Sequence, residues 1–380
     1  MARTLIFPEQ LNKERIHIQK QVNSFKQLLT EKDRMQYYVS FTLRMFGQSL
    51  YFIFIPALLL NLNYTIKHIG VYYLIWTAAQ LITTVLAGKI TYTKGIRAAF
   101  ALGTIPLTLF LFTTPIINSW LLFSISALAG GMANALFWTP YHQYLSLRTK
   151  TGTRGRTITG IATMAAPAIG GILLDSIGST LTLGATAVIA ILALIPLWMT
   201  KNVKTKSSCS FKEIYKTKKE WSGFFATGLT TAGAGMLWPL AFYIILKGYT
   251  ILGIITFATS LIALLVANIA GWKHDKKDDK KVLKIGAYGQ AITLFARLAA
   301  INPIIATIVD TVDKMINKVF WIGVDSQSYK LREKDENAIV KREVAMHSGI
   351  FILFLFLSIT GSLTISFIIA GLSSIFVTKI

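Results

Sequence analysis

The chain has 380 residues, of which 53% are hydrophobic and only 15% are charged, and its mean hydropathy is +0.54. Soluble domains of this size are rarely so apolar, so the composition favours an integral membrane protein. A formal charge of +22 would suit a nucleic-acid binder, but the distribution of the basic residues described below argues against that class.

Residues 1–35 contain no apolar run long enough for a signal peptide. Apolar residues recur there at helical spacing among basic ones, which predicts an amphipathic leader helix. We expect this leader to lie on the cytoplasmic lipid surface or to pack beneath the bundle. The apolar positions are Leu11, Ile18, Val22, Phe25 and Leu29.

Twelve apolar segments of bilayer-spanning length follow the leader. The connections between them alternate between very short ones and basic ones. The expected spans are 36–60, 69–88, 97–115, 119–140, 156–175, 179–199, 221–246, 249–271, 284–300, 302–325, 343–360 and 362–378.

The basic residues divide unevenly between the two sides of these spans. The leader, the even-numbered connections and the C-terminus hold 33 Lys and Arg residues, the odd-numbered connections hold two, and four lie inside spans. The positive-inside rule therefore places both termini and the basic loops in the cytoplasm. The excess charge is a topology signal, and we expect a multi-pass protein of a prokaryotic inner membrane.

A shift of 183 residues aligns two halves of the chain, and duplicated halves are common in transporters. The matches include Pro56 with Pro239, Gly70 with Gly253, Asn134 with Asn317, and Phe137-Trp138 with Phe320-Trp321. We predict an all-α membrane protein with twelve transmembrane helices in two pseudo-symmetric six-helix bundles around a central cavity. The predicted parts are a leader (1–35), a first half (36–199), a basic linker (200–220) and a second half (221–380).

The connection after the second span keeps two spaced glycines and a terminal arginine, with Tyr92 at an intervening position. The equivalent connection of the second half keeps a glycine, an acid and a base. With the span count and the repeat, these loops resemble the major facilitator superfamily, whose signature loop has an acid where Tyr92 stands. The resemblance implies that the loops latch the halves on the cytoplasmic face, although Asp275 also suits a solvated charge. The candidate gating-loop residues are Gly88, Gly95, Arg97, Gly271 and Asp275.

The fifth span contains Pro167, Gly170 and Gly171, which is similar to the Pro-x-x-Gly-Gly motif of drug/proton antiporters in that superfamily. Proline permits a helix kink and glycines permit close helix approach. The motif therefore fits either an antiporter or general helix packing.

The tenth span carries charges that are costly inside a bilayer, at about 2.5–3.5 kcal/mol each on insertion scales. Helical spacing places Asp310, Asp313, Lys314, Asn317 and Trp321 on one face. We expect this face to line a cavity or the interior of the bundle.

Two interpretations of these charges stay open. Arg297 in the preceding span is within reach of Asp310, and Asp310 and Lys314 form an i,i+4 pair, so the charges could be a structural ion-pair cluster. Alternatively, a carboxylate binds a proton or a substrate cation. The aligned positions of the first half are Ala127, Gly130 and Gly131.

Polar and aromatic residues on other spans are further candidates for a substrate cavity. Arg44 could instead snorkel to the headgroups, and the tryptophans could anchor helices at the interface. Glu343 and His347, one turn apart, fit either a proton relay or hydrogen-bonded packing. The cavity candidates are Arg44, Gln48, Tyr51, Asn134, Trp138, Trp238, Tyr243, Asn317 and Trp321.

No motif organises enzyme chemistry, a nucleotide site or a metal site, so we expect no enzyme activity, cofactor or metal. We predict a secondary transporter, active as a monomer, that moves a small organic solute by alternating access with protons as the coupling ion, and that suits export. A non-transporting receptor or accessory protein, a sugar or metabolite importer, and a uniporter remain alternatives.

Overall fold

The structure is a computed structural model that describes residues 31–147, 160, 163–205, 219–272, 279–333 and 335–380. About 90% of it is helical, and its described residues contain no strand. The expected all-α fold is thereby confirmed in its class. Most of the leader lies outside the described residues.

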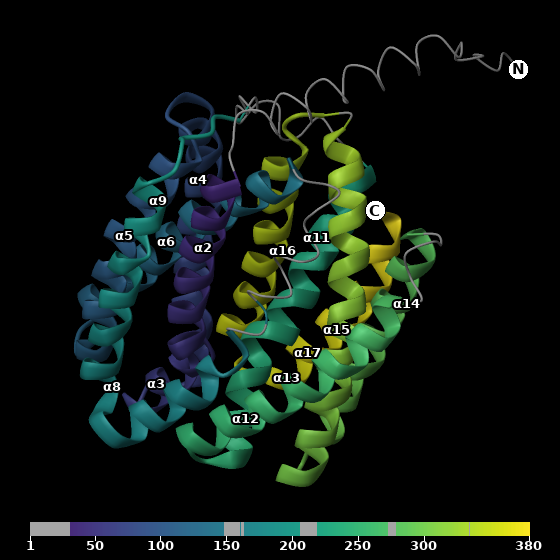
Figure 1. Cartoon of the computed structure of the whole chain (residues 1–380). Helices are drawn as coiled ribbons and strands as arrows, with labels where there is room; N and C mark the ends of the chain where they lie inside the picture. The colour runs from purple at the N-terminus through teal and green to yellow at the C-terminus, as the bar shows by residue number, and fades with distance from the viewer. Residues whose placement is uncertain (1–30, 148–159, 161–162, 206–218, 273–278, 334) are drawn as a thin grey trace, which may run out of the picture.

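The first group of helices, coloured purple to teal, occupies the left of Figure 1. The expected first span continues from α2 through the short 3-10 turn Phe52–Phe54 into α3. The members are α2 (Glu31–Tyr51), α3 (Ile55–Asn61), α4 (Ile66–Thr93), α5 (Ile96–Thr113), α6 (Trp120–Ser146), α8 (Ala166–Leu192) and α9 (Leu194–Trp198).

The second group, green to yellow, occupies the right of Figure 1. Its first helix has a π-helical segment, Ala232–Leu237, between α11 and α12, and α14 ends in the 3-10 turn Arg297–Ala299. The members are α11 (Lys219–Thr231), α12 (Trp238–Leu246), α13 (Tyr249–Trp272), α14 (Asp279–Ala296), α15 (Pro303–Arg332), α16 (Ala338–Thr360) and α17 (Leu363–Phe376).

Short polar residues start several of these helices, as their sequence favours. The Thr65 hydroxyl accepts a hydrogen bond from the His68 backbone, and Ser119 caps α6 in the same way. The Asn302 side chain caps α15, the helix that carries the charges, with a bond of 3.0 Å from the Ile305 backbone. Local sequence therefore fixes where α15 begins, which sets the depth of its charged face.

The described helices form eleven continuous segments, so the expected count of twelve stays a prediction. The difference arises in α8, which contains the second half of the fifth expected span and most of the sixth. Gly178 interrupts α8 with φ 80° and ψ 172°, a conformation that glycine adopts without strain. Among the described residues, seven helices are long and apolar enough to cross a membrane.

The two ends of the bundle differ in their connections. We call the end at which α4 ends and α5 begins the basic end, after Lys89, Lys94 and Arg97 beside that connection. The start of α11 meets the end of the chain at this end, where Gly223 lies against Ile380. The other end, with the short turns after α3 and α12, is called the opposite end (Figure 1).

The two groups meet along two helix pairs, α4 with α16 and α8 with α13. Glycines bring both pairs into backbone contact. A Cβ at Gly70 would lie 2.6 Å from the Ser358 nitrogen, and one at Gly253 would collide with the Pro167 carbonyl. Gly70 and Gly253 are equivalent in the internal repeat, so the duplication places the same close approach at both interfaces.

Candidate functional site

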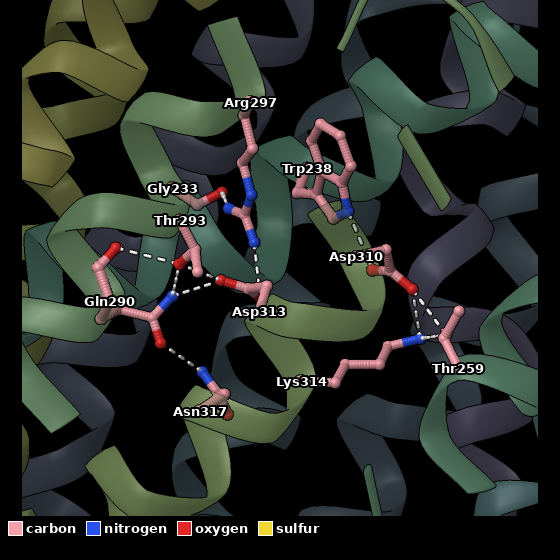
Figure 2. A network of polar contacts seen from close by, with 10 residues as sticks. All are labelled: Gly233, Trp238, Thr259, Gln290, Thr293, Arg297, Asp310, Asp313, Lys314 and Asn317. Atoms are coloured by element: carbon pink, nitrogen blue, oxygen red, sulfur yellow. Dashed lines mark hydrogen bonds and ion pairs between the residues drawn. The ribbon is translucent and has the colours of Figure 1, made fainter. Parts of the chain in front are cut away.

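The charged face of α15 lies between α12, α13 and α14, and its two carboxylates turn to different neighbours (Figure 2). Asp310 accepts hydrogen bonds from Trp238 Nε1 at 2.9 Å and from the Thr259 hydroxyl at 2.6 Å. Lys314 Nζ lies 2.8 Å from Asp310 Oδ2. Asp310 is 3% exposed, so its charge is compensated inside the bundle.

Asp313 faces α14. Its Oδ2 lies 2.6 Å from Arg297 Nη2, and its Oδ1 accepts hydrogen bonds from Gln290 at 2.5 Å and Thr293 at 2.7 Å. Arg297 also donates to the Gly233 carbonyl at 3.0 Å. Both oxygens of this carboxylate therefore have partners, as a buried charge requires.

Arg297 thus pairs with Asp313, whereas the sequence suggested Asp310. Residues three apart on a helix point about 60° away from one another, so Asp310 reaches α12 and α13 while Asp313 reaches α14. The guanidinium lies 4.8 Å from the ring centroid of Trp238 and 5.8 Å from that of Phe367. Packing against two aromatic rings holds it in place.

Lys314 is the more accessible of the two cations, with a side chain 22% exposed. Its ammonium donates to the Thr256 carbonyl at 2.9 Å and to the Thr259 hydroxyl at 2.6 Å. Asn317, one turn further on, donates to Gln290 at 3.2 Å. Lys314 therefore belongs to the surroundings of Asp310, and Asn317 extends those of Asp313 through Gln290.

A cavity of about 230 Å³ opens beside this network. All five residues of the predicted polar face of α15 line it. Ile53 comes from the first group of helices, so the cavity lies at the junction of the two groups. The other lining residues are Thr231, Ala234, Gly235, Trp238, Pro239, Phe242, Leu252, Thr256, Asp310, Asp313, Lys314, Asn317 and Trp321.

The cavity candidates of the first group lie elsewhere. Arg44 is 4% exposed and lies over the Phe137 ring at 5.4 Å, and Tyr51 packs against Phe110. Gln48 donates to Asn134 at 3.3 Å. These residues connect α2 with α5 and α6.

Two further candidates lie near the ends of the bundle. Trp138 stacks beside His142 on α6. Tyr243 exchanges hydrogen bonds with Asn61 at the opposite end, at 2.9 and 3.2 Å. Neither lines the cavity described above.

The candidate gating-loop residues that the structure describes make contacts of two kinds. Gly88 lies against Val340 of the second group, where a Cβ would approach within 2.9 Å. Gly95 has φ 91° and precedes α5, and Arg97 Nη1 donates to the Thr200 carbonyl at 3.0 Å within its own group. Gly271 lies in α13, and Asp275 lies outside the described residues.

The Pro-x-x-Gly-Gly residues lie where α8 meets two neighbours. A Cβ at Gly170 would collide with the Leu50 carbonyl of α2, and one at Gly171 with the Tyr249 carbonyl of α13. Pro167 is at the first turn of α8. These close approaches account for both glycines by packing.

Glu343 and His347 form a second polar cluster with His142, Gln80 and Thr84 near the basic end. These last three were not predicted from the sequence, and neither were the partners of Asp313. Their spacing along the chain carries no signal, because each comes from a different helix from its partner. The partners that were missed in the first network are Gly233, Thr259, Gln290 and Thr293.

Comparison with known proteins identifies the architecture. A family model described as the Major Facilitator Superfamily matches residues 37–314. No match was found among curated protein sequences. The human organic anion transporter MFSD10 is similar in structure, with a TM-score of 0.65 and 10% identity over 92% of this chain and 100% of that one.

Two other solved structures are similar. A D-xylose–proton symporter has a TM-score of 0.66 and 14% identity over 90% of this chain and 95% of that one. A POT family transporter in complex with a thioalcohol-conjugated peptide has a TM-score of 0.66 and 11% identity over 91% and 94%. At such identities these likenesses concern the fold alone. Because the family model spans most of the chain, this protein belongs to the Major Facilitator Superfamily, a family of membrane transporters.

Proposed function

We propose that this protein is a secondary transporter that moves a small organic solute by alternating access and couples its movement to protons at Asp310. The observation that carries the proposal is a buried carboxylate that shares its cation with a cavity between the two helix groups. In alternating access such a site is exposed to each side of the membrane in turn.

The Asp310–Lys314 pair has the properties of an exchangeable site. Its ammonium is partly exposed on the cavity, so a solute can reach it. A proton on Asp310 would cancel the carboxylate charge and leave the Lys314 ammonium without its counter-ion. A polar group of the solute would then take the place of the carboxylate beside the ammonium. Proton and solute would therefore bias the same conformational equilibrium.

The Asp313–Arg297 pair suits a different role. The Arg297 side chain is 0% exposed and is held by the Gly233 carbonyl and two aromatic rings. Separating this pair would leave a guanidinium buried without a counter-ion, which is costly. In our proposal Asp313 and Arg297 hold α14 and α15 in register and so position Asp310.

The cavity lining indicates the kind of solute. Trp238, Phe242 and Trp321 supply aromatic surface, and Asn317 and Thr256 supply hydrogen-bonding groups, a combination suited to a small organic molecule. A sugar or metabolite importer, a uniporter or a non-transporting receptor would share the scaffold.

The test uses purified protein in liposomes with an internal pH dye and an imposed pH gradient. A panel of cationic, neutral and anionic compounds is added, and proton movement is recorded for wild type, Asp310→Asn and Asp313→Asn. We expect compound-dependent proton movement in wild type and its loss in Asp310→Asn. Lys318→Gln, which removes a charge from the same helix outside the network, should retain it.

Two results would overturn the proposal. Equal proton movement in wild type and Asp310→Asn would exclude this carboxylate as the coupling site. If no compound moves protons in wild type, single cysteines introduced into the cavity and labelled from each side decide between two alternatives. Uncoupled transport changes their accessibility, and a static receptor does not.

A further inference from the structure

A second cavity, of about 210 Å³, lies within the second helix group near the basic end. The start of α11, the end of α15 with the connection that follows it, and the start of α16 surround it. None of its described lining residues belongs to the first cavity. Its volume suits a small polar molecule rather than a single water. The lining residues are Glu220, Trp221, Phe224, Leu331, Asp335, Ala338, Lys341 and Arg342.

Arg342 brings a buried guanidinium with unused donors to this cavity. Its side chain is 0% exposed, and its Nη1 lies 3.1 Å from Asp325 Oδ1 and its Nε 3.6 Å from Glu343 Oε1. Among the described residues, Nη2 has no hydrogen-bond partner. A guanidinium has five N–H donors, and a buried donor without an acceptor costs free energy. Arg342 can therefore bind a further acceptor oxygen inside the cavity.

Two neighbours at the start of α11 add an unused donor and an unused acceptor. Trp221 Nε1 is buried and donates no hydrogen bond within the described part of the chain. Glu220 lies in the first turn of α11, and its carboxylate has no hydrogen bond or ion pair with a described residue. The other acid of the lining, Asp335, is bound by Lys341 at 2.6 Å. The lining therefore offers a guanidinium edge, an indole N–H and one carboxylate.

These three groups together determine the kind of ligand that fits. An anion alone would use the donors of Arg342 and Trp221 and leave Glu220 without a partner. A cation alone would bind Glu220 and leave both donors unused. A zwitterion satisfies all three groups, with an oxyanion that accepts the two N–H bonds and an ammonium that donates to the carboxylate.

The position of the cavity along the helices agrees with the depth of lipid headgroups. Trp221 begins the predicted span 221–246, and the lining residues of α16 precede the predicted span 343–360. Tryptophan is enriched at this boundary between membrane and water. Phe224 and Leu331 supply apolar surface beside the polar groups. At this depth the common zwitterion is a phosphate joined to an ammonium.

We propose that this cavity binds a phosphate–ammonium zwitterion, with phosphate oxygens accepting hydrogen bonds from Arg342 and Trp221 and the ammonium donating to Glu220. A phospholipid headgroup and a soluble phosphodiester of the same structure share this chemistry. The inference does not depend on the solute cavity or on proton coupling at Asp310, because it involves no residue of that site.

The test measures binding to the purified full chain in detergent, by native mass spectrometry and by the shift of thermal unfolding. The probes are phosphatidylethanolamine, phosphatidylglycerol, which keeps the phosphate but lacks the ammonium, and soluble glycerophosphoethanolamine. We expect one phosphatidylethanolamine to bind at least about tenfold more tightly than phosphatidylglycerol, because the Glu220 bond to the ammonium is lost. Equally tight binding of the soluble compound would identify a free zwitterion as the ligand, and binding of the lipid alone would identify a headgroup.

Three variants test the assigned contacts. Glu220→Gln should remove the preference for phosphatidylethanolamine over phosphatidylglycerol, since it removes only the partner of the ammonium. Trp221→Phe keeps the aromatic surface and should weaken binding of both lipids several-fold. Arg342→Lys should weaken both by about tenfold or more, because an ammonium does not reproduce the planar guanidinium edge.

The matched controls change the same kinds of side chain outside the cavity. Glu333→Gln, at the end of α15, and Trp198→Phe, in α9, should keep wild-type binding. Equal binding of the two lipids by wild type, or no binding of any probe, would overturn the zwitterion site. Unchanged binding in both Glu220→Gln and Trp221→Phe would also overturn it, and these two variants decide even if Arg342→Lys fails to fold.

Discussion

The ion pair between Arg297 and Asp313 gives a quantitative expectation for stability. Its side chains are 0% and 6% exposed and its nearest atoms are 2.6 Å apart. Charges centred about 4 Å apart attract by about 4 kcal/mol at an effective dielectric constant of about 20. Because removal of one partner leaves the other charge buried, Arg297→Met should lower the free energy of unfolding by about 3–5 kcal/mol.

A double-mutant cycle separates the pair energy from the loss of packing. Unfolding of Arg297→Met, Asp313→Asn and the double variant in mixed micelles, followed by tryptophan fluorescence, should give a coupling of about 3 kcal/mol. The control pair is Lys341–Asp335, also 2.6 Å apart but with side chains 14% and 32% exposed.

The partly exposed control pair should couple by less than about 1 kcal/mol. A coupling for Arg297 and Asp313 no larger than the control value would refute the structural role assigned to this buried pair. It would also remove the reason for preferring Asp310 as the exchangeable carboxylate.

Two further predictions concern contacts between the helix groups. Gly70→Ala should lower stability by about 1–3 kcal/mol in the same unfolding assay, because its Cβ would press on the Ser358 backbone; Gly184→Ala, with nothing within 4 Å, should not. Tyr243→Phe removes the hydrogen bonds to Asn61, which stabilise the contact by about 0.5–1.5 kcal/mol. Spin labels placed on the two helix groups at the opposite end should then report a longer distance between the groups. Equal stability of the glycine variants, or unchanged distances, would contradict these expectations.

Sequence periodicity was sufficient to predict the helices and the polar face of α15, since both depend on local spacing. It could not choose between Asp310 and Asp313 as the partner of Arg297. That choice depends on which neighbour each side of α15 meets, and a helix pattern alone does not contain the neighbour's position. The number of spans also depends on Gly178, because the fifth and sixth expected spans join there within α8 and are counted as one helix.

The contacts that cross between helix groups were the hardest to predict. His142 is 201 residues from Glu343, and neither residue belongs to a motif. Thr259 and Gln290 were overlooked because a lone polar residue in an apolar helix is common, and only the facing carboxylate distinguishes them. The partners of the charged residues could therefore be identified only from the tertiary structure.

The internal repeat shows what occupies the first group at the positions that carry the charges of α15 in the second group. The positions equivalent to Asp313 and Lys314 are Gly130 and Gly131, and a Cβ at either would collide with Trp76 of α4. The same backbone positions therefore serve close aromatic packing in the first group and ion pairs in the second. The duplicated fold requires the equivalent helix in each half, but it does not require charged residues in either. Charged residues cost free energy on insertion into the membrane, and small packing residues do not. Their presence in the second group alone fits a task that the two groups divide between them.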